Sequence, residues 1–393
     1  MRKAILLFVC SAAAALVAYE AGVFSILKSD ARIGRQADGV HLVPTNQLLR
    51  PWGEQTLFPG RPVDLAFDSN KRVLAILNWR GVLFADASSG ARLAEVKTLA
   101  TSYTGVAFRP GDRELWVSET SRNGPDSIAI IEIDELGRAG KIDRIKLAEN
   151  HPLPAGIAFS VDGATAYVAF SRSNTLAVVD AAGRRVAREI PVGMAPFGVA
   201  VAAKADKIFV TNRGGRGPAA GDTTAPSSGT DVVTDARTGS TPTGTVTVID
   251  LASLAPREVA VGLAPSHMAL SPDQKTLAVA NGHSDSVSLL DTATLRKTDV
   301  AMPSYPEGSA GSLPVSAVFA ADGKMVYVAC GGINAIAVVT ARGQGWALAG
   351  TLPTGYFPSA LALGPEGALR VVSIKGNANT ADSKGTFNSR QYE

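Results

Sequence analysis

Residues 154–170 read PAGIAFSVDGATAYVAF, and residues 314–330 read PVSAVFAADGKMVYVAC. In both stretches a proline precedes a short apolar run, the pair Asp-Gly follows as a tight-turn former, and a second β-rich run ends the unit. Apolar residues alternate with a period of two, and no helical period competes with this alternation. Each stretch therefore predicts two antiparallel strands joined by a hairpin turn.

The same pattern recurs seven times along the chain. The units begin at residues 62, 103, 154, 196, 265, 314 and 358, so their starts are separated by 41, 51, 42, 69, 49 and 44 residues. In most units a third run follows, such as LAVVD ending at Asp180 or SVSLLD ending at Asp291, and a weaker fourth run leads to the next unit. Repeats of this spacing indicate four-stranded units packed side by side.

The two ends of the repeat favour a closed ring over a sandwich or a solenoid. The seventh unit has no third run after Ser373, whereas the prefix at residues 40–58, VHLVPTNQLLRPWGEQTLF, holds one or two unpaired runs. A ring gains from pairing these segments, and an open array does not. The sequence predicts an all-β, seven-bladed β-propeller of four-stranded antiparallel blades. We expect it to be closed by the N-terminal segment, with residues 40–58 pairing onto strands near residues 360–373.

Composition supports a packed core and excludes a nucleic-acid footprint. Of 393 residues, 46% are hydrophobic and 19% are charged, and the formal net charge is only +3. Phosphate binding needs a concentrated basic surface, so no nucleic-acid partner is expected. We also expect no cofactor and no metal site.

The N-terminus reads MRKAILLFVCSAAAALVA, a basic start followed by an apolar run and small residues. This is typical of a secretory signal, and the run is short for a membrane span. We expect a signal peptide at residues 1–18, or an uncleaved anchor that would be the only membrane contact. A linker at 19–39, a propeller at 40–375 with an insertion loop at 213–244, and a tail at 376–393 complete the expected organisation. Export to the periplasm or the medium follows, and Cys330 would be the one cysteine left after cleavage.

The units resemble the YVTN-type β-propeller repeat of secreted, YncE-like bacterial proteins, a WD40-like repeat. Residues 209–212 read FVTN, residues 167–169 and 327–329 read YVA, and residues 271–273 read SPD. The resemblance covers about residues 40–375. It implies the fold and carries little information about function, because this repeat is scaffolding.

A narrower resemblance involves the long excursion in the fourth unit. The run GGRGPAAGDTTAPSSGTDVVTDARTGSTPTGTVTVID looks like the expanded blade of two-domain proteins in which such a propeller precedes an alkaline-phosphatase-like phosphoesterase domain. The ending KGTFNSRQYE looks like the segment leading onward in that group. These 393 residues contain nothing that could supply that domain's nucleophile and metal ligands, so its activity is not expected here.

Basic residues recur where the second strand of a unit ends. In a propeller this position and the start of the first strand open on the same face. A convergent basic rim would attract an anionic ligand, which arginine grips in bidentate fashion. The alternative is a set of solvated loop charges offset by Glu119, Asp126 and Asp285. The rim candidates are Arg80, Arg122, Arg172, Arg213, Arg216, His283 and Lys375.

His267 is the sharpest single position. Its equivalents in the other units are Asp64, Gly105, Gly156, Gly198, Ser316 and Ala360, so most units place a small residue there, facing the expected channel. An imidazole at this point, with His283 nearby, could hold a metal ion or move a proton. The bland interpretation, which the sequence favours, is a channel-lining histidine bonded to a carbonyl or to water.

The sequence holds no nucleophile elbow, phosphate-cradling loop or paired cysteine motif, so no catalytic residue is assigned. We expect an exported scaffold that binds a small anionic ligand or a protein partner. The alternatives are a lactonase-like propeller hydrolase, for which Asp64, His267 and a rim arginine are the candidates, and an accessory domain for a phosphoesterase. The long loop after Asn212 is expected either to cover the rim as an ordered segment or to be a mobile surface insertion.

Overall fold

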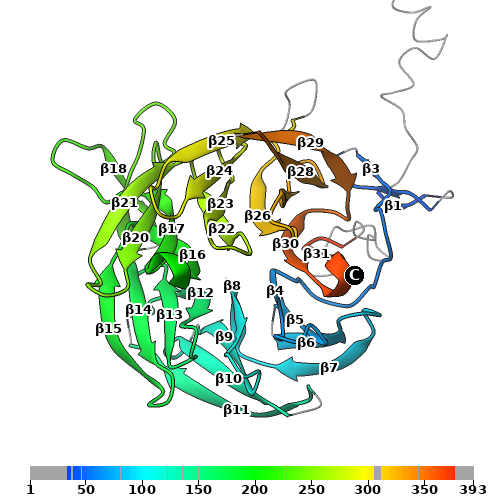
Figure 1. Ribbon diagram of the computed structural model, residues 1–393, viewed down its shortest axis with the longest axis horizontal. Helices are drawn as coiled ribbons and strands as arrows, with labels where there is room; N and C mark the ends of the chain where they lie inside the picture. Colours follow the sequence, from blue (N-terminus) through cyan, green and yellow to red (C-terminus); the bar gives the residue numbers. More distant parts are fainter. Residues whose placement is uncertain are drawn as a thin grey trace, which may run out of the picture.

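The computed structural model describes residues 33–376, except 37–38, 46, 80, 122, 135–136, 149, 228, 305–310 and 344. Seven sheets stand around a central axis, each with its first strand innermost (Figure 1). The chain is an all-β, seven-bladed propeller, which confirms the fold predicted from the repeat. The described residues include two short 3-10 helices, η2 (Ala203–Ala205) and η3 (Pro365–Gly367). No helix in the described part of the chain is long and apolar enough to cross a membrane.

Six blades have four antiparallel strands each, in sequence order from the axis outward. Blade one holds β4 (Asp64–Phe67), β5 (Val73–Asn78), β6 (Gly81–Asp86) and β7 (Arg92–Lys97), and blade two holds β8 (Ala100–Phe108), β9 (Glu114–Thr120), β10 (Ser127–Ile133) and β11 (Ala139–Lys146). Blade three holds β12 (Pro154–Phe159), β13 (Thr165–Phe170), β14 (Thr175–Asp180) and β15 (Arg185–Pro191). Blade four holds β16 (Met194–Ala202), β17 (Lys207–Gly215), β20 (Gly244–Asp250) and β21 (Pro256–Val261).

Blade five holds β22 (Pro265–Leu270), β23 (Thr276–Asn281), β24 (Ser286–Asp291) and β25 (Lys297–Ala301), and blade six holds β26 (Pro314–Phe319), β27 (Met325–Cys330), β28 (Ala335–Arg342) and β29 (Gly345–Pro353). Blade seven has two described strands, β30 (Pro358–Leu363) and β31 (Leu369–Ser373). Outside the blades lie β1 (Gly34–Arg35), β2 (His41–Leu42) and β3 (Leu48–Leu49) in one small sheet, and β18 (Thr224–Ser227) with β19 (Thr230–Val233) in a hairpin.

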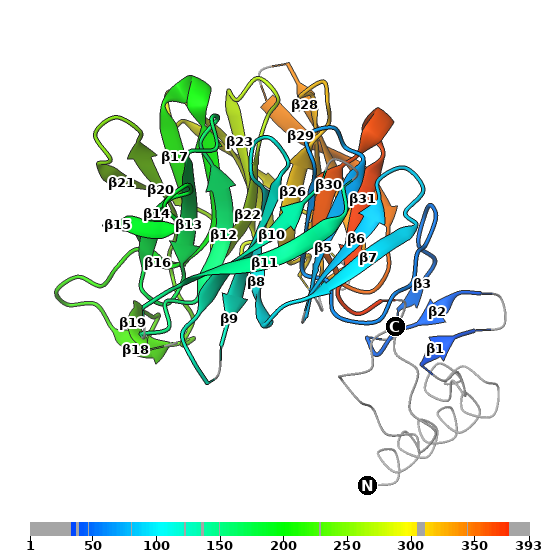
Figure 2. The same cartoon turned by 90° about the horizontal axis from the view of Figure 1, so that it is seen from below.

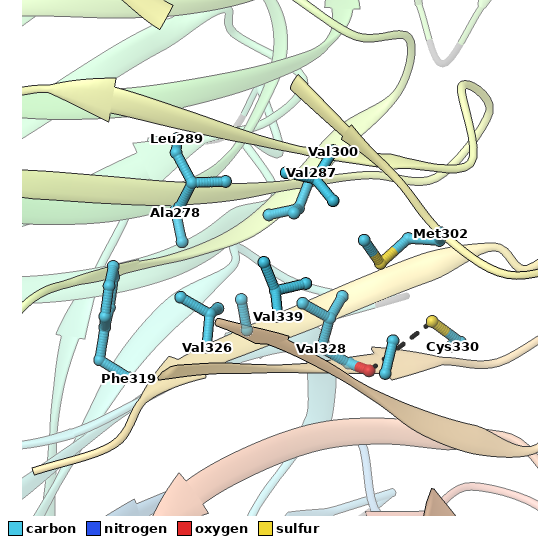
Figure 3. Packing of buried hydrophobic residues seen from close by; sticks show 12 residues of the cluster. Ala278, Val287, Leu289, Val300, Met302, Phe319, Val326, Val328, Cys330 and Val339 are labelled. Atoms are coloured by element: carbon cyan, nitrogen blue, oxygen red, sulfur yellow. Dashed lines mark hydrogen bonds between the residues drawn. The ribbon is translucent and has the colours of Figure 1, made fainter. Parts of the chain in front are cut away.

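The core lies between the blades, because neighbouring sheets cover both faces of the middle strands. Between blades five and six, Val287 and Leu289 of the third strand β24 pack over Val326 and Val328 of β27 (Figure 3). The fourth strands, such as β21, are largely exposed. The third strand of each complete blade therefore supplies much of the contact with the next blade.

The ring closes where β30 lies beside β4 (Figure 1). Ser359 Oγ donates a hydrogen bond to the Pro62 carbonyl oxygen at 3.0 Å, and Leu65 and Ala360 belong to one apolar cluster. The same kind of bond joins inner strands elsewhere, as from Thr211 Oγ1 to the Ser266 carbonyl oxygen at 2.6 Å. Closure thus rests on side-chain packing and short cross-blade bonds.

The predicted pairing of residues 40–58 with residues 360–373 is not what the structure has. Residues 41–42 pair with residues 48–49 on one side and with β1 on the other, and Val43 and Leu49 pack on Tyr356. The Trp52 N–H donates to the Pro353 carbonyl oxygen at 3.0 Å, so the segment runs along the last blades without joining their sheets. Pro51 interrupts the segment, and a proline lacks the N–H that a sheet ladder needs.

The insertion in blade four leaves β17 after Gly215 and returns at Gly244. Its β18–β19 hairpin projects from the side of the ring that carries the connections between second and third strands, at the lower left of Figure 2. We call this side the loop face. The β1–β3 sheet lies at the same level on the opposite side of the ring (Figure 2).

Cys330 ends β27 and is completely buried, with its Sγ 3.6 Å from the Val328 carbonyl oxygen (Figure 3). Burial raises the pKa of its thiol to about 12. A thiol is nucleophilic as the thiolate, so we expect no reaction with a disulfide reagent at pH 8 in the folded protein and full reaction in urea. Cys10 is replaced by serine for this assay, so that one thiol is counted. Rapid labelling of the folded chain would show that this blade opens locally.

Candidate functional site

Inner strands enter the channel wall from the loop face through a proline and an irregular step. In blade five the pairing register shifts between Pro265 and Met268, and blades three, four, six and seven have equivalent shifts after their prolines. A bulge of this kind re-aims a side chain away from the regular ladder. In blade five the step contains His267.

The loops in front of these prolines are fixed by acidic and amide side chains. Each of four residues preceding a proline has a left-handed backbone, with φ between 47° and 62°, which is costly for a residue other than glycine. The N–H of each is bound by a side chain of the preceding blade at 2.8 to 2.9 Å. The pairs are Leu153 with Asp126, Ala195 with Asn174, Leu313 with Asp285, and Phe357 with Asn334.

The sequence suggested that three acidic residues, Glu119, Asp126 and Asp285, could neutralise the charge of a basic rim. Their hydrogen bonds in the structure show a different role. Asp126 and Asp285 hold backbone N–H groups, as described above. Glu119 is fully buried and accepts bonds from Arg144 Nε at 2.9 Å and Ser127 Oγ at 2.7 Å. All three carboxyl groups therefore accept structural hydrogen bonds, and Asp126 and Asp285 form theirs with the entry loop of the next blade.

Arg213, Phe197 and His267 form a stack on the loop-face side of blades four and five. The guanidinium carbon of Arg213 (β17) lies 4.9 Å from the centroid of the Phe197 ring (β16). The His267 ring (β22) meets the same phenyl ring edge-on, with centroids 5.3 Å apart and an interplanar angle of 67°. Phe197 is buried, so it fixes the guanidinium of Arg213 and the imidazole of His267 relative to each other.

The guanidinium of Arg213 is not neutralised by an ion pair within the part of the chain that the structure describes. Its recorded interactions are the Phe197 ring and the electrostatic influence of Tyr103, whose side chain is exposed. Arg213 is an exposed residue. Partial desolvation by its neighbours lowers the pKa of the guanidinium from its usual value, and the group stays charged at neutral pH. An exposed cation that lies beside an aromatic ring and has no ion-pair partner among the described residues is accessible to an anion.

Neighbouring groups shift the pKa of His267 in opposite directions. Desolvation is the main cause that lowers its pKa; Asp64 acts in the opposite direction, and the charge of Arg213 lowers the pKa further. Asp64, the equivalent residue in blade one, has its carboxylate engaged in structural hydrogen bonds. Its Oδ2 accepts bonds from Thr104 Oγ1 at 2.7 Å and from the Gly105 N–H at 2.9 Å, which joins blade one to blade two.

The lowered pKa of His267 predicts a pH dependence of stability. The unfolded chain takes up this proton near pH 6.5, whereas the folded chain resists it until a lower pH. Below pH 6.5 the unfolded state therefore binds more protons, and the free energy of unfolding falls as pH falls. In His267→Gln the fall between pH 7 and pH 5.5, measured by urea unfolding, should be smaller. Identical pH profiles for the two proteins would contradict the lowered pKa.

The structure separates the other predicted rim residues from this stack or leaves them undescribed. Arg216 forms a bidentate pair with Asp222 inside the insertion, at 2.6 and 2.8 Å, and this bonding lowers the pKa of Asp222 to about 2. Arg172 is exposed and donates to the His151 carbonyl oxygen at 3.3 Å. His283 is an exposed loop residue. Arg80 and Arg122 lie outside the described residues.

Lys375 marks a second, smaller group of ring contacts at blade seven. Its Nζ lies 4.6 Å from the Tyr356 ring centroid and 5.3 Å from that of Phe357. Three of the predicted rim residues thus have separate surroundings. Arg213 stacks on Phe197, Lys375 lies over two aromatic rings, and Arg216 forms an ion pair within the insertion. In residues 33–376, apart from the gaps stated above, no group of three or more His, Cys, Asp and Glu side chains is arranged to hold a metal ion.

Sequence reasoning missed Phe197 and Tyr103. Phe197 follows the proline that opens the fourth unit, where the other units have Val63, Thr104, Ala155, Ser266, Val315 and Ser359. When the repeats are aligned, Phe197 is the one aromatic residue at a position that is otherwise small or aliphatic, and this difference could have identified it.

Comparison with known proteins supports the fold and no more. No protein-family model and no curated protein matches the chain. Among solved structures 1172 chains match, so the architecture is too widely shared to indicate a function. One of them is hydrazine synthase of Kuenenia stuttgartiensis, with 19% identity, a TM-score of 0.61, and coverage of 82% of this chain and 98% of that chain. At this identity the likeness shows a shared propeller fold.

Proposed function

We propose that this chain is an exported, YVTN-type propeller that binds a small anionic ligand on its loop face, between Arg213 and His267. The observation that supports this most directly is the charge of Arg213, which is exposed and stacked on Phe197 without a carboxylate partner among the described residues. The repeat and the basic, apolar N-terminus support the class of protein and its export to the periplasm or the medium.

The geometry favours a carboxylate or phosphate over a neutral ligand. Arginine offers two parallel N–H donors to either group, and stacking on the buried phenyl ring of Phe197 orients the exposed guanidinium. An anion beside His267 would favour its protonated form. Binding should therefore take up a proton and strengthen as pH falls from neutral toward the lowered pKa of His267.

A screen of simple anions tests this function. Dicarboxylates, sugar phosphates and inorganic phosphate are titrated against the purified chain at fixed ionic strength, with matched neutral alcohols as controls. We expect saturable thermal stabilisation by one class of anion, stronger at pH 6 than at pH 8, with a matching shift of the His267 ring signals in NMR. Equal, unsaturable effects of all salts would show non-specific screening and overturn the proposal.

A hydrolase of the lactonase kind is the second candidate, because the charges of Asp64 and Arg213 both act on His267. The commitment of Asp64 to Thr104 and Gly105 makes it a poor general base. Turnover of a lactone that is lost in His267→Gln while anion binding persists would favour this candidate over a binding protein.

A further inference from the structure

The seventh blade leaves a strand edge open beside an apolar cavity. β31 has β30 as its hydrogen-bonded neighbour, and within the described residues no strand pairs with its other edge. The adjoining cavity has a volume of about 480 Å³. It lies between blades six and one, and its apolar lining includes Leu65, Ile76, Leu83, Ile336, Leu352 and Val371.

The other six blades show what occupies this place in the architecture. There the third strand pairs with the second and packs between two sheets, as Val287 and Leu289 do in Figure 3. Third strands such as β6, GVLFAD, and β20, GTVTVID, are buried on both faces along most of their length. The occupant that fits blade seven is therefore a strand of about six residues with apolar side chains on both faces.

The two ends of the chain differ in how well they fit this description. Residues 377–393 follow Gly376 at the edge of the cavity, but their sequence, NANTADSKGTFNSRQYE, holds no apolar run. Residues 22–27 read GVFSIL, which matches the composition of β6. The chain enters the described structure at residue 33, next to β1, and the β1–β3 segment packs through Val43 and Leu49 on Tyr356, whose neighbour Gly355 lines the cavity.

Residues 28–33 connect the GVFSIL segment to β1. Six extended residues span up to about 20 Å, which is the length of a six-residue strand.

We infer that residues 22–27, which lie outside the described residues, dock into this cavity and pair with β31 as the third strand of blade seven. Docking satisfies the backbone groups on the open edge of β31 and covers apolar side chains of blades six and one. The stretch after the expected signal is then a structural strand of the propeller, and neither a linker nor a membrane anchor.

Hydrogen exchange of the whole purified chain tests the docking, with its N-terminus determined by mass. In the unchanged chain we expect the backbone amides of residues 369–373 to exchange at least about tenfold more slowly than in Phe24→Asp/Ile26→Asp, because two charges on the same face of a buried strand expel it. Ser29→Asp adds a charge just beyond the segment and should leave the exchange unchanged. The amides of β27 in complete blade six report whether any variant has lost its fold.

Two results would overturn the inference. One is equal exchange of residues 369–373 in the unchanged chain and in Phe24→Asp/Ile26→Asp. The other is release of these amides by deletion of residues 377–393, which would make the C-terminal tail the occupant. If the double variant fails to fold, a photo-crosslinker on Ser25→Cys in the otherwise unchanged chain replaces it. Crosslinks to β31 or to the lining strands of blades one and six support docking, and crosslinks elsewhere or none contradict it.

Discussion

Replacement of Trp116 by alanine should lower the free energy of unfolding by about 3 to 5 kcal/mol, the usual cost of removing a large buried aromatic side chain. Trp116 is fully buried between blades two and three, and its ring meets Phe159 edge-on at 5.2 Å. Its Nε1–H donates to Glu114 Oε2 at 2.9 Å, and Glu114 also binds Arg109 and Arg184. Alanine therefore leaves both a cavity and a missing donor.

Urea unfolding followed by circular dichroism measures this loss, and Trp116→Phe is the matched control. Phenylalanine keeps most of the ring contacts and leaves Glu114 with its two arginines, so its cost should be about 1 to 2 kcal/mol. A loss below about 1 kcal/mol in Trp116→Ala would mean that the two blades collapse into the space, contrary to a rigid contact between them.

Replacement of Arg213 by glutamine should weaken the proposed anionic ligand by about 10- to 150-fold. Hydrogen bonds from a charged donor contribute about 1.5 to 3 kcal/mol, and this range converts to that factor. The glutamine side chain would keep a donor and part of the volume but lose the charge that Phe197 holds in place. Calorimetric titration with the anion identified in the screen gives the ratio of dissociation constants.

Arg188→Gln makes the same chemical change on the exposed outer strand of blade three and should alter binding by less than about threefold. Equal weakening in both variants would show that net charge, and not the stack, attracts the anion. Arg216→Gln should instead loosen the insertion, since Arg216 is bound to Asp222. Hydrogen exchange across residues 217–243 distinguishes that effect from a loss of ligand contact.

Much of the architecture could be predicted because each blade is encoded locally. The proline, the apolar run and the Asp-Gly turn lie within 17 consecutive residues of a unit such as 154–170, and hairpins are decided by neighbours in the chain. The position of His267 was found in the same way, because the repeats can be superimposed and one imidazole stands in a column of mostly small residues. The closing segment was predicted wrongly, since counting strands at the two ends ignored Pro51 and the packing of Val43 and Leu49 on Tyr356.

The candidate site could be predicted only in part, because its contacts cross between blades. Arg213 and His267 belong to units separated by the long insertion, and only the ring brings both against Phe197. The sequence likewise gives no sign that Glu119 is buried with Arg144, so the acidic residues looked available to neutralise the rim. Which charges are already paired is a property of the folded surface.

The sequence by itself determined the β class, the number of blades and the residues at the start of each inner strand, because strand period and turn chemistry act over a few residues. Only the tertiary structure decided that Arg213 has no carboxylate partner among the described residues, that Arg216 pairs with Asp222, and that an apolar cavity lies beside β31. Those outcomes depend on distances between side chains far apart in the sequence. The closing of the ring sets these distances, and no local pattern encodes them.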